Sequence, residues 1–345
     1  MNTPLNSSYL FTMTSDDGCE QKAYHWQGLS SPKNAPFSRA DLREKNDPQK
    51  IIDTTFNAFG KDWRPDVFCI LGRGIEQQKN GNWRPTTIFE KMHITNPTYK
   101  IYGHTGHAQD TIDMNADDIR IGGANLNVHA ASNLLFSLYQ NEVLPKTIFF
   151  SAGRPNYIAE LDPEGTLSES DVLCKKLFNK VYAKIGSETL NPNTFSFETI
   201  KNTQGQSIYD VASFGDRNVV KAKYNTNSVD DLRAAIYYAQ QNGQKNVAFL
   251  TIRHHAIRCN EVLNFWYRNK DPVVEGVDAR MITAEKIMSA YRPGYGKIAR
   301  AIEDTQPSRW HAAAEIRGAY LIIEQSYDST QTAQKNTLFP MLHDS

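Results

Sequence analysis

The chain has 345 residues, of which 40% are hydrophobic and 11% aromatic, enough for one large packed domain with insertions. Its 38 Lys and Arg residues balance its 38 Asp and Glu residues, so no global charge draws it toward nucleic acid or an anionic membrane. Because no apolar stretch approaches the roughly 20 residues of a spanning helix and no secretory signal is evident, we expect a soluble, cytoplasmic protein.

The N-terminal part of the sequence predicts an arm, a helix, a strand and an insertion. Residues 1–46 are polar and rich in Ser, Asn and Pro, and indicate an extended or loosely packed arm. Asp47-Pro48 is typical of a helix start. The apolar run 67–71 predicts a buried strand. Residues 76–122 are polar with several Gly and Pro, and predict an insertion.

From residue 123 onward, helical patterns alternate with short apolar runs rich in Val, Ile and Phe. The predicted helices cover residues 125–141, 168–184, 228–242 and 256–268, and the predicted strands cover residues 147–150, 218–220 and 246–251. Residues 186–217 are expected to form a second, irregular insertion. Residues beyond 270 are expected to be mostly helical, most clearly 309–326, where Ala313, Ile316, Tyr320 and Ile323 recur at helical spacing.

This alternation predicts an α/β fold with a mainly parallel sheet. We expect the α/β domain to span residues 47–270, with insertions at 76–122 and 186–217. Residues 271–345 would form a helical C-terminal extension that packs on this domain.

Short polar motifs follow four of the predicted strands. In a parallel sheet, the loops beyond the carboxyl ends of the strands gather at one edge, where ligands bind. Motifs that are distant in the sequence would therefore line one cleft. They are Gly72-Arg73-Gly74, Ser151-Ala152-Gly153-Arg154, Asn225-Thr226 and Thr251-Ile252-Arg253-His254-His255.

The first two motifs contain small residues, which let backbone amides approach a ligand. Gly72-Arg73-Gly74 lacks the third glycine of a dinucleotide fingerprint, and a plain strand-exit turn is the alternative. Arg154 follows the second small-residue turn and could hold an anion. Glu169 begins the next helix, where it either complements the helix dipole or points into the cleft as a base.

The fourth motif is the strongest signal. His255 and Arg258 are three residues apart and therefore neighbours on the first turn of a helix, whose unpaired amides suit phosphate or carboxylate. Thr251 and His254 belong to the same predicted site, and structural histidines are the alternative. Asn225-Thr226 is also compatible with an ordinary loop or cap.

Metal binding is not expected. His93, His104 and His107 have no accompanying Cys or well-placed acid, and consecutive His254 and His255 would diverge on a helix. The four cysteines are scattered and form no CxxC pair, so we expect buried free thiols in a reducing compartment. They are Cys19, Cys69, Cys174 and Cys259.

The segments ILGRGI (70–75), SAG (151–153), SES (168–170), NT (225–226) and TIRHHAIRC (251–259) resemble the YdcF/SanA/ElyC-like bacterial family of unknown function. The resemblance covers about residues 66–268. It implies a Rossmann-like three-layer fold of the soluble YdcF type and, by analogy with one member type, S-adenosylmethionine binding. Other members are associated with cell-envelope and lipid-carrier metabolism. The positions that it carries over are Gly72, Gly74, Ser151, Gly153, Glu169, Asn225, Thr226, His255 and Arg258.

Three hypotheses of function follow. The first is binding of a nucleotide-like or phosphorylated small molecule, as in a transferase or an S-adenosylmethionine binder. The second is a phosphoester or pyrophosphate hydrolase, in which His255 and Glu169 would be catalytic and Arg154 and Arg258 would neutralise oxyanions. The third is a non-catalytic protein that binds a partner through its insertions or C-terminal helices. Ala152, Ser228 and Val229, which depart from the family pattern, favour the third hypothesis. The retained Glu169, His255 and Arg258 support the first two.

Overall fold

The computed structural model describes the central part of the chain with side chains. The described residues are 45–78, 80–86, 123–154, 158, 162–163, 165, 167–223, 227–296, 315–316 and 318–320, together with the backbone of 9–14 and 20–24. At the N-terminus, β1 (Tyr9–Thr14) and β2 (Glu20–Tyr24) form a two-stranded antiparallel sheet. This pairing lies within the segment that was expected to be an arm.

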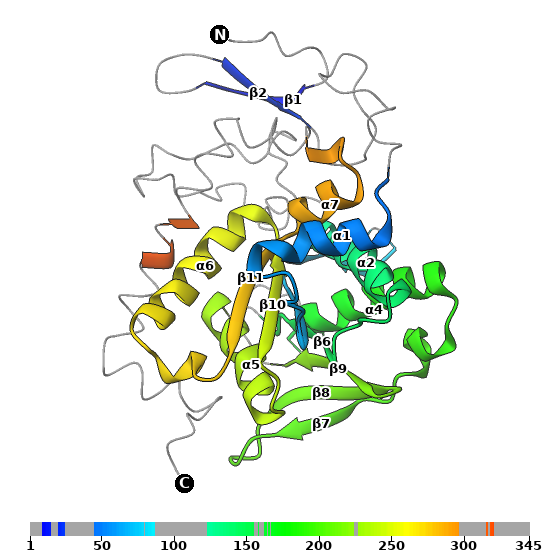
Figure 1. Cartoon of the computed structure of the whole chain (residues 1–345), viewed down its shortest axis with the longest axis vertical. Helices are drawn as coiled ribbons and strands as arrows, with labels where there is room; N and C mark the ends of the chain where they lie inside the picture. The colour runs from blue at the N-terminus through cyan, green and yellow to red at the C-terminus, as the bar shows by residue number, and fades with distance from the viewer. Residues whose placement is uncertain are drawn as a thin grey trace.

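A seven-stranded sheet lies at the centre of the molecule (Figure 1). Its first five strands run parallel, and the last two are antiparallel to their neighbours. Every residue of the third and fourth strands is buried, as expected for strands covered on both faces. The order is β11 (Asp278–Thr283), β10 (Asn246–Thr251), β3 (Val67–Leu71), β6 (Thr147–Ser151), β9 (Arg217–Ala222), β8 (Ser207–Phe214) and β7 (Glu198–Lys201).

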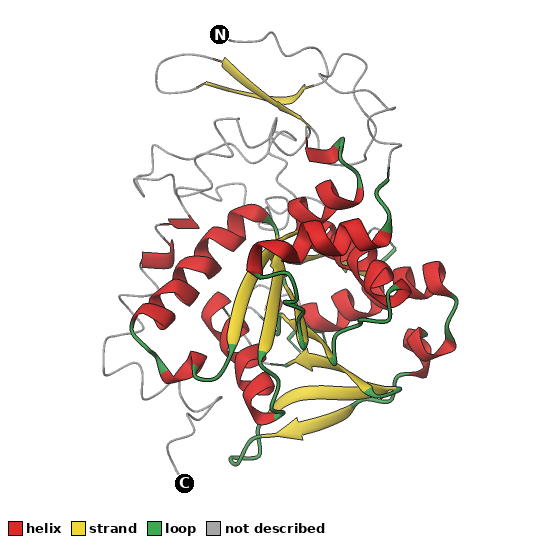
Figure 2. Ribbon diagram, viewed as in Figure 1, coloured by secondary structure: helices red, strands yellow, loops and turns green. Residues whose placement is uncertain are grey.

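Helices cover both faces of this sheet, which gives the predicted α/β fold with three layers (Figure 2). One face packs against α1 (Pro48–Phe56), α2 (Ala124–Gln140), α4 (Glu169–Ile185) and α7 (Ala284–Tyr291). The other face packs against α5 (Ser228–Gln241) and α6 (Arg253–Arg268).

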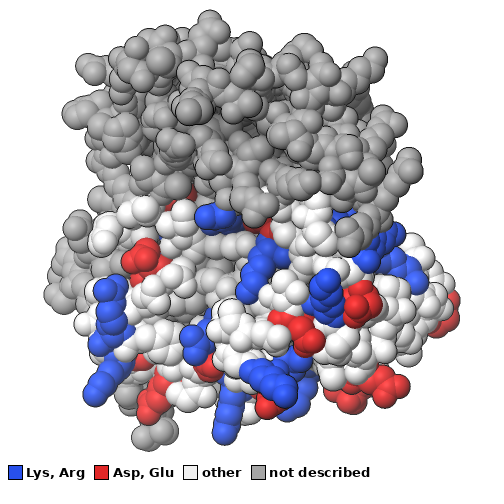
Figure 3. Space-filling model, turned by 45° about the horizontal axis from the view of Figure 1, so that its top comes forward, with Lys and Arg blue, Asp and Glu red and all other residues white. Residues whose placement is uncertain are grey.

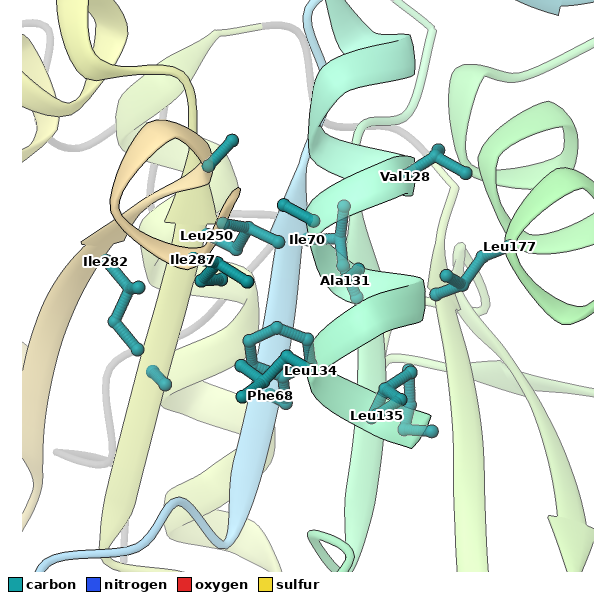
Figure 4. Close-up of a cluster of buried hydrophobic side chains, with 14 of the residues drawn as sticks. Phe68, Ile70, Val128, Ala131, Leu134, Leu135, Leu177, Leu250, Ile282 and Ile287 are labelled. Atoms are coloured by element: carbon teal, nitrogen blue, oxygen red, sulfur yellow. The ribbon is translucent and has the colours of Figure 1, made fainter. Parts of the chain in front are cut away.

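Side chains of β3 alternate between the two faces. Phe68 and Ile70 join the core beneath α2, where Phe68 lies beside Leu134 (Figure 4). Val67, Cys69 and Leu71 join the core beneath α5 and α6. The continuous apolar run VFCIL is therefore the sequence pattern of a strand buried on both sides.

The helix starts follow from their capping residues. A side-chain oxygen of Asp47 accepts a hydrogen bond from the Lys50 amide at the start of α1. The Ser168 hydroxyl accepts one from the Asp171 amide at the start of α4. Asn227 accepts two at the start of α5. These bonds fix where each helix begins at the edge of the sheet.

The chain order of the strands reverses between β3 and β10. From β3 the chain proceeds to β6 and then β9, through α2 and α4 on one face. It then returns to β10, on the other side of β3, and continues to β11 through α5 and α6 on the opposite face. Where the connections after two neighbouring parallel strands run to opposite faces of the sheet, α/β proteins bind ligands in the crevice beyond the carboxyl ends of these strands.

Two segments differ from their expected descriptions. Residues 186–217 are not irregular, because β7 and β8 extend the sheet from them. The segment beyond residue 270 supplies β11, a fifth parallel strand, before the helix α7.

The remaining differences are smaller. The predicted helix 256–268 begins earlier, at Arg253. Within the insertion 76–122, β4 (Ile75–Gln77) pairs with β5 (Trp83–Pro85), while His93, His104 and His107 lie outside the described residues. Residues 315–316 and 318–320 are helical, as expected for the segment 309–326.

Figure 3 shows basic and acidic side chains interspersed over the described part of one face. Within the described ranges, no helix is both long enough and apolar enough to cross a membrane.

Candidate functional site

The turn after β3 and the first turn of α6 meet at the point where the strand order reverses. The Val247–Leu250 segment of β10 lies in register with the Val67–Ile70 segment of β3, so the two strands end side by side. The Arg73 guanidinium lies 3.1 Å from Nδ1 of His255. The structure therefore brings the first and fourth predicted motifs into contact, although they are far apart in the sequence.

Glu169 shapes the turn after β3. Its carboxylate accepts a hydrogen bond of 3.2 Å from the Gly74 amide, and its side chain is buried. A Cβ atom on Gly72 would lie 2.0 Å from a Glu169 carboxylate oxygen and 2.3 Å from Cβ of Ala152. Gly74 has φ of +95°, which favours glycine. Packing therefore requires glycine at position 72, and the backbone conformation favours glycine at position 74. The Glu169 carboxylate contacts the turn at both positions.

The turn after β6 is satisfied internally. The Ser151 hydroxyl donates a hydrogen bond of 2.5 Å to the carbonyl of Asp231 on α5. The carbonyls of Ala152 and Gly153 accept the amides of Ser170 and Glu169 at the start of α4. The small-residue turn thus caps α4, and these two amides of the helix are already used.

Arg154 is held within its own loop. Its guanidinium lies 3.1 Å from the Asp162 carboxylate and donates to the Leu167 carbonyl at 3.2 Å. The Asp162 carboxylate also accepts the Leu167 amide. These contacts neutralise Arg154 and give it a structural role, which weakens the prediction that it binds an anion.

Two arginines converge on a carboxylate that the sequence did not predict. The Glu315 carboxylate lies 2.8 Å from Nε of Arg258 and 3.3 Å from Nη2 of Arg73. The Arg73 and Glu315 side chains are buried, whereas 28% of the Arg258 side chain is exposed. We call Arg73, His255, Arg258 and Glu315 the cationic cluster, because its two guanidinium groups outnumber its single carboxylate.

The neighbours of His255 define its tautomer. An arginine N–H can only donate, so Nδ1, which faces Arg73, must be the unprotonated acceptor. The proton of the neutral ring is then on Nε2, which lies 3.5 Å from both the Ser228 hydroxyl and the Cys259 thiol. The Glu315 carboxylate, 3.8 Å from Nδ1, is beyond hydrogen-bonding distance.

Burial and the nearby guanidinium of Arg73 lower the pKa of His255 to about 4. Desolvation is the larger cause, because it disfavours the charged imidazolium. The His255 ring is therefore neutral at pH 7. It can accept a hydrogen bond from Arg73 and donate one from Nε2, but it carries no positive charge.

Glu315 remains ionised. Burial acts to raise the pKa of its carboxyl, but the neighbouring Arg258 and Arg73 guanidinium groups outweigh burial, and the pKa lies well below its usual range. A carboxylate held by two guanidinium groups is the arrangement that arginines adopt around phosphate and carboxylate ligands.

Two buried polar atoms near the ends of β3 and β10 have no hydrogen-bond partner among the described residues. They are Oγ1 of Thr251 and Oδ1 of Asn127. The amide group of Asn127, on α2, donates to the Leu71 carbonyl at 3.0 Å. Because buried polar atoms are nearly always satisfied, each of these atoms is a candidate to contact a ligand or water.

The other predicted site residues have less defined roles. His254 is buried on α6, and its ligand-binding role remains a prediction. The amide of Arg253, beside it, donates to the Glu285 carboxylate at 2.9 Å, so an acidic side chain already caps this helix. Asn225 and Thr226 lie outside the described residues.

The cysteines and metal ligands can be described only in part. Cys69, Cys174 and Cys259 are buried free thiols, as predicted, whereas Cys19 lies outside the described residues. Burial raises the pKa of Cys174 to about 12. In the part of the chain with described side chains, no group of three or more His, Cys, Asp or Glu residues could hold a metal ion.

Sequence reasoning missed Asn127 and Glu315. Asn127 is a polar residue on the buried face of α2, next to Val128, and this break in an apolar face was the available signal. Glu315 was obscured by the apolar spacing of residues 309–326. In the structure Ile316 and Tyr320 are exposed, whereas Glu315 and Ala319 are buried, so the apolar residues Ile316 and Tyr320 do not mark the buried face.

Comparison of the chain with protein-family models, with curated proteins and with solved structures found no match.

Proposed function

We propose that the protein binds an anionic small molecule, either nucleotide-like or phosphorylated, in the crevice between the carboxyl ends of β3 and β10. The observation that carries the proposal is the cationic cluster at this point of strand reversal. Arg73 and Arg258 both bind the carboxylate of Glu315, and His255 buttresses Arg73. A site that already holds one carboxylate has the chemistry to hold another anion.

Charge and burial favour an anion here. With His255 neutral, the side chains of the cationic cluster carry two positive charges and one negative charge. Charges interact more strongly in a poorly hydrated site than in water. Guanidinium groups match the oxygens of phosphate and carboxylate with two parallel hydrogen bonds.

The unsatisfied polar atoms suit the remainder of such a ligand. The Thr251 hydroxyl can donate to a ligand oxygen, and the Asn127 carbonyl oxygen can accept from a ligand hydroxyl or amine. Ribose and base edges present both kinds of group. This combination supports the nucleotide-like class, in which S-adenosylmethionine also falls.

The state of His255 supports binding over hydrolysis. A general acid or base works best with a pKa near the operating pH, whereas the pKa of His255 is about 4. Its Nδ1 is occupied by Arg73, and Glu169 holds the Gly74 amide. Membership of the soluble YdcF-like group is part of the proposal, and it is supported by the position of the quoted motifs on neighbouring parallel strands.

The test is a binding measurement with pyrophosphate, ATP and S-adenosylmethionine, by thermal shift and then by titration calorimetry. A bound ligand in excess raises the melting temperature by mass action. Arg258→Ala should weaken binding about 10- to 100-fold, in line with the roughly 1.5–3 kcal/mol of a hydrogen bond to a charged group. The matched control is Arg268→Ala, which removes a cation from the last turn of the same helix and should bind like the parent.

Two results would change the proposal. If the probes bind and both variants bind them like the parent, the cluster is structural and the interaction-protein hypothesis leads. If the parent releases phosphate from pyrophosphate or ATP and His255→Ala lowers this turnover about 100-fold with binding unchanged, the hydrolase hypothesis replaces it.

A further inference from the structure

The C-terminal segment places a carboxylate at the point where the arginines would hold a ligand anion. We propose that Glu315 is an intramolecular occupant of the anion site and that a ligand must displace its segment to bind. This inference rests on the proposed function. It adds regulation of the same site by the chain's own C-terminal helix.

The contacts of Glu315 resemble those of a bound anion. Its two carboxylate oxygens are divided between the arginines, with Oε2 2.8 Å from Nε of Arg258 and Oε1 3.3 Å from Nη2 of Arg73. The carboxylate is also 3.8 Å from the His255 ring. A phosphate oxygen placed between the same guanidinium groups would make the same ion pairs, so both anions cannot be held at once.

The helix backbone also covers Arg258. A Cβ atom on Gly318 would lie 2.9 Å from Nη2 and 3.1 Å from Cζ of Arg258. A side chain at this position would crowd the Arg258 guanidinium. Gly318 and Glu315 therefore approach the same guanidinium from two points on the segment.

The segment has little apolar attachment among its described residues. Ala319 is fully buried, but Ile316 and Tyr320, the larger apolar side chains, are 42% and 57% exposed. Among the described residues of the segment, Ala319 is therefore the one buried apolar side chain. Segments with few buried apolar contacts open at low free-energy cost. A ligand with more negative charge than one carboxylate can compete for the two guanidinium groups.

The test uses the full-length chain and inorganic pyrophosphate as the probe, with titration calorimetry as the measurement. Glu315→Gln keeps the size of the side chain but removes its charge, so the segment should be released and a larger fraction of molecules should be open. Apparent affinity is proportional to that open fraction, and we expect binding to become about tenfold tighter or more.

The matched control is Glu198→Gln, which makes the same charge change on β7, where the side chain is exposed. It should bind pyrophosphate like the parent. A second variant, Gly318→Leu, pushes the helix from Arg258 without changing any charge and should also tighten binding. If Glu315→Gln does not fold, the affinity of Gly318→Leu for pyrophosphate tests the occupant role by itself.

The outcomes separate the two proposals. If the parent binds pyrophosphate and both variants bind it equally or more weakly, the occupant role is rejected and the proposed function stands. If the parent does not bind and Glu315→Gln does, the occupant role is supported most strongly. If neither protein binds, the anion-binding function fails and this inference fails with it.

Discussion

Substitution of Gly72 by alanine tests the packing on which the candidate site is built. The added Cβ would lie 2.0 Å from a Glu169 oxygen and 2.3 Å from Cβ of Ala152. Neither neighbour can yield easily. Ala152 has no flexible side chain, and the Glu169 carboxylate is fixed by the Gly74 amide. The turns after β3 and β6 would therefore have to separate.

The expected destabilisation combines two effects. Overpacking a buried site typically costs about 1–3 kcal/mol, and loss of a hydrogen bond to a charged group costs about 1.5–3 kcal/mol. If Glu169 moves away from the added Cβ, the overpacking is relieved but the hydrogen bond to the Gly74 amide is lost. The two costs therefore do not add in full, and we expect a destabilisation of about 2–4 kcal/mol in total. This corresponds to a fall in melting temperature of roughly 5–15 °C for a domain of this size.

Urea unfolding, followed by tryptophan fluorescence, measures this free energy. The matched control is Gly296→Ala, because among the described residues a Cβ there would meet Ser289 alone, at 3.4 Å or more. This variant should unfold within about 0.5 kcal/mol of the parent. A Gly72→Ala variant as stable as this control would refute the described packing of Glu169 against the turn.

Three further predictions concern single side chains. Arg73→Ala should lower the free energy of unfolding by about 3–5 kcal/mol, as when one partner of a buried ion pair is removed. Arg258→Ala should lower it by clearly less, because the Arg258 side chain is 28% exposed. Equal losses in urea unfolding would contradict this difference in burial. His255 should make the fold acid-labile, because its pKa is 6.5 when unfolded and about 4 when folded. The unfolded state therefore binds the proton first as pH falls from 6.5 to 4, and up to about 3 kcal/mol of stability is lost in that window. His255→Gln should flatten this dependence in urea titrations at pH 7, 5.5 and 4.5, and an unchanged slope would reject the assignment. Burial raises the pKa of the Cys69 and Cys259 thiols, so both thiols should resist Ellman's reagent at pH 8 until the protein unfolds. Mass spectrometry locates the labelled cysteine. Rapid labelling of Cys69 or Cys259 in the folded protein would show that this thiol is accessible.

The central strands could be predicted from sequence because burial on two faces leaves a plain signature. VFCIL (67–71) and NVAFLT (246–251) are nearly continuous apolar runs, and both are strands. The edge strands lack this signature. β11 has only Ala279 and Ile282 buried, and every residue of β7 is exposed. Hydrogen bonds to a neighbouring strand stabilise these two strands, and the apolar pattern of the sequence does not reveal such bonds.

The candidate site shows the same division between local and long-range information. His255 and Arg258 are recognisable because their spacing on one helix turn is local. The pairing of Arg73 with His255 depends on β10 lying beside β3, and this strand order is a property of the whole chain. Glu315 reaches the site only through tertiary packing, and the apolar pattern around it favoured the opposite helix face.

The central claim is that Arg73 and Arg258 form an oxyanion site at the carboxyl ends of β3 and β10. The most direct measurement is anomalous scattering from crystals soaked in tungstate, an oxyanion whose metal can be located without ambiguity. The account predicts a tungstate with oxygens within hydrogen-bonding distance of both guanidinium groups, in place of the Glu315 carboxylate. Crystals that bind tungstate elsewhere, with Glu315 still held between the two arginines, would contradict it.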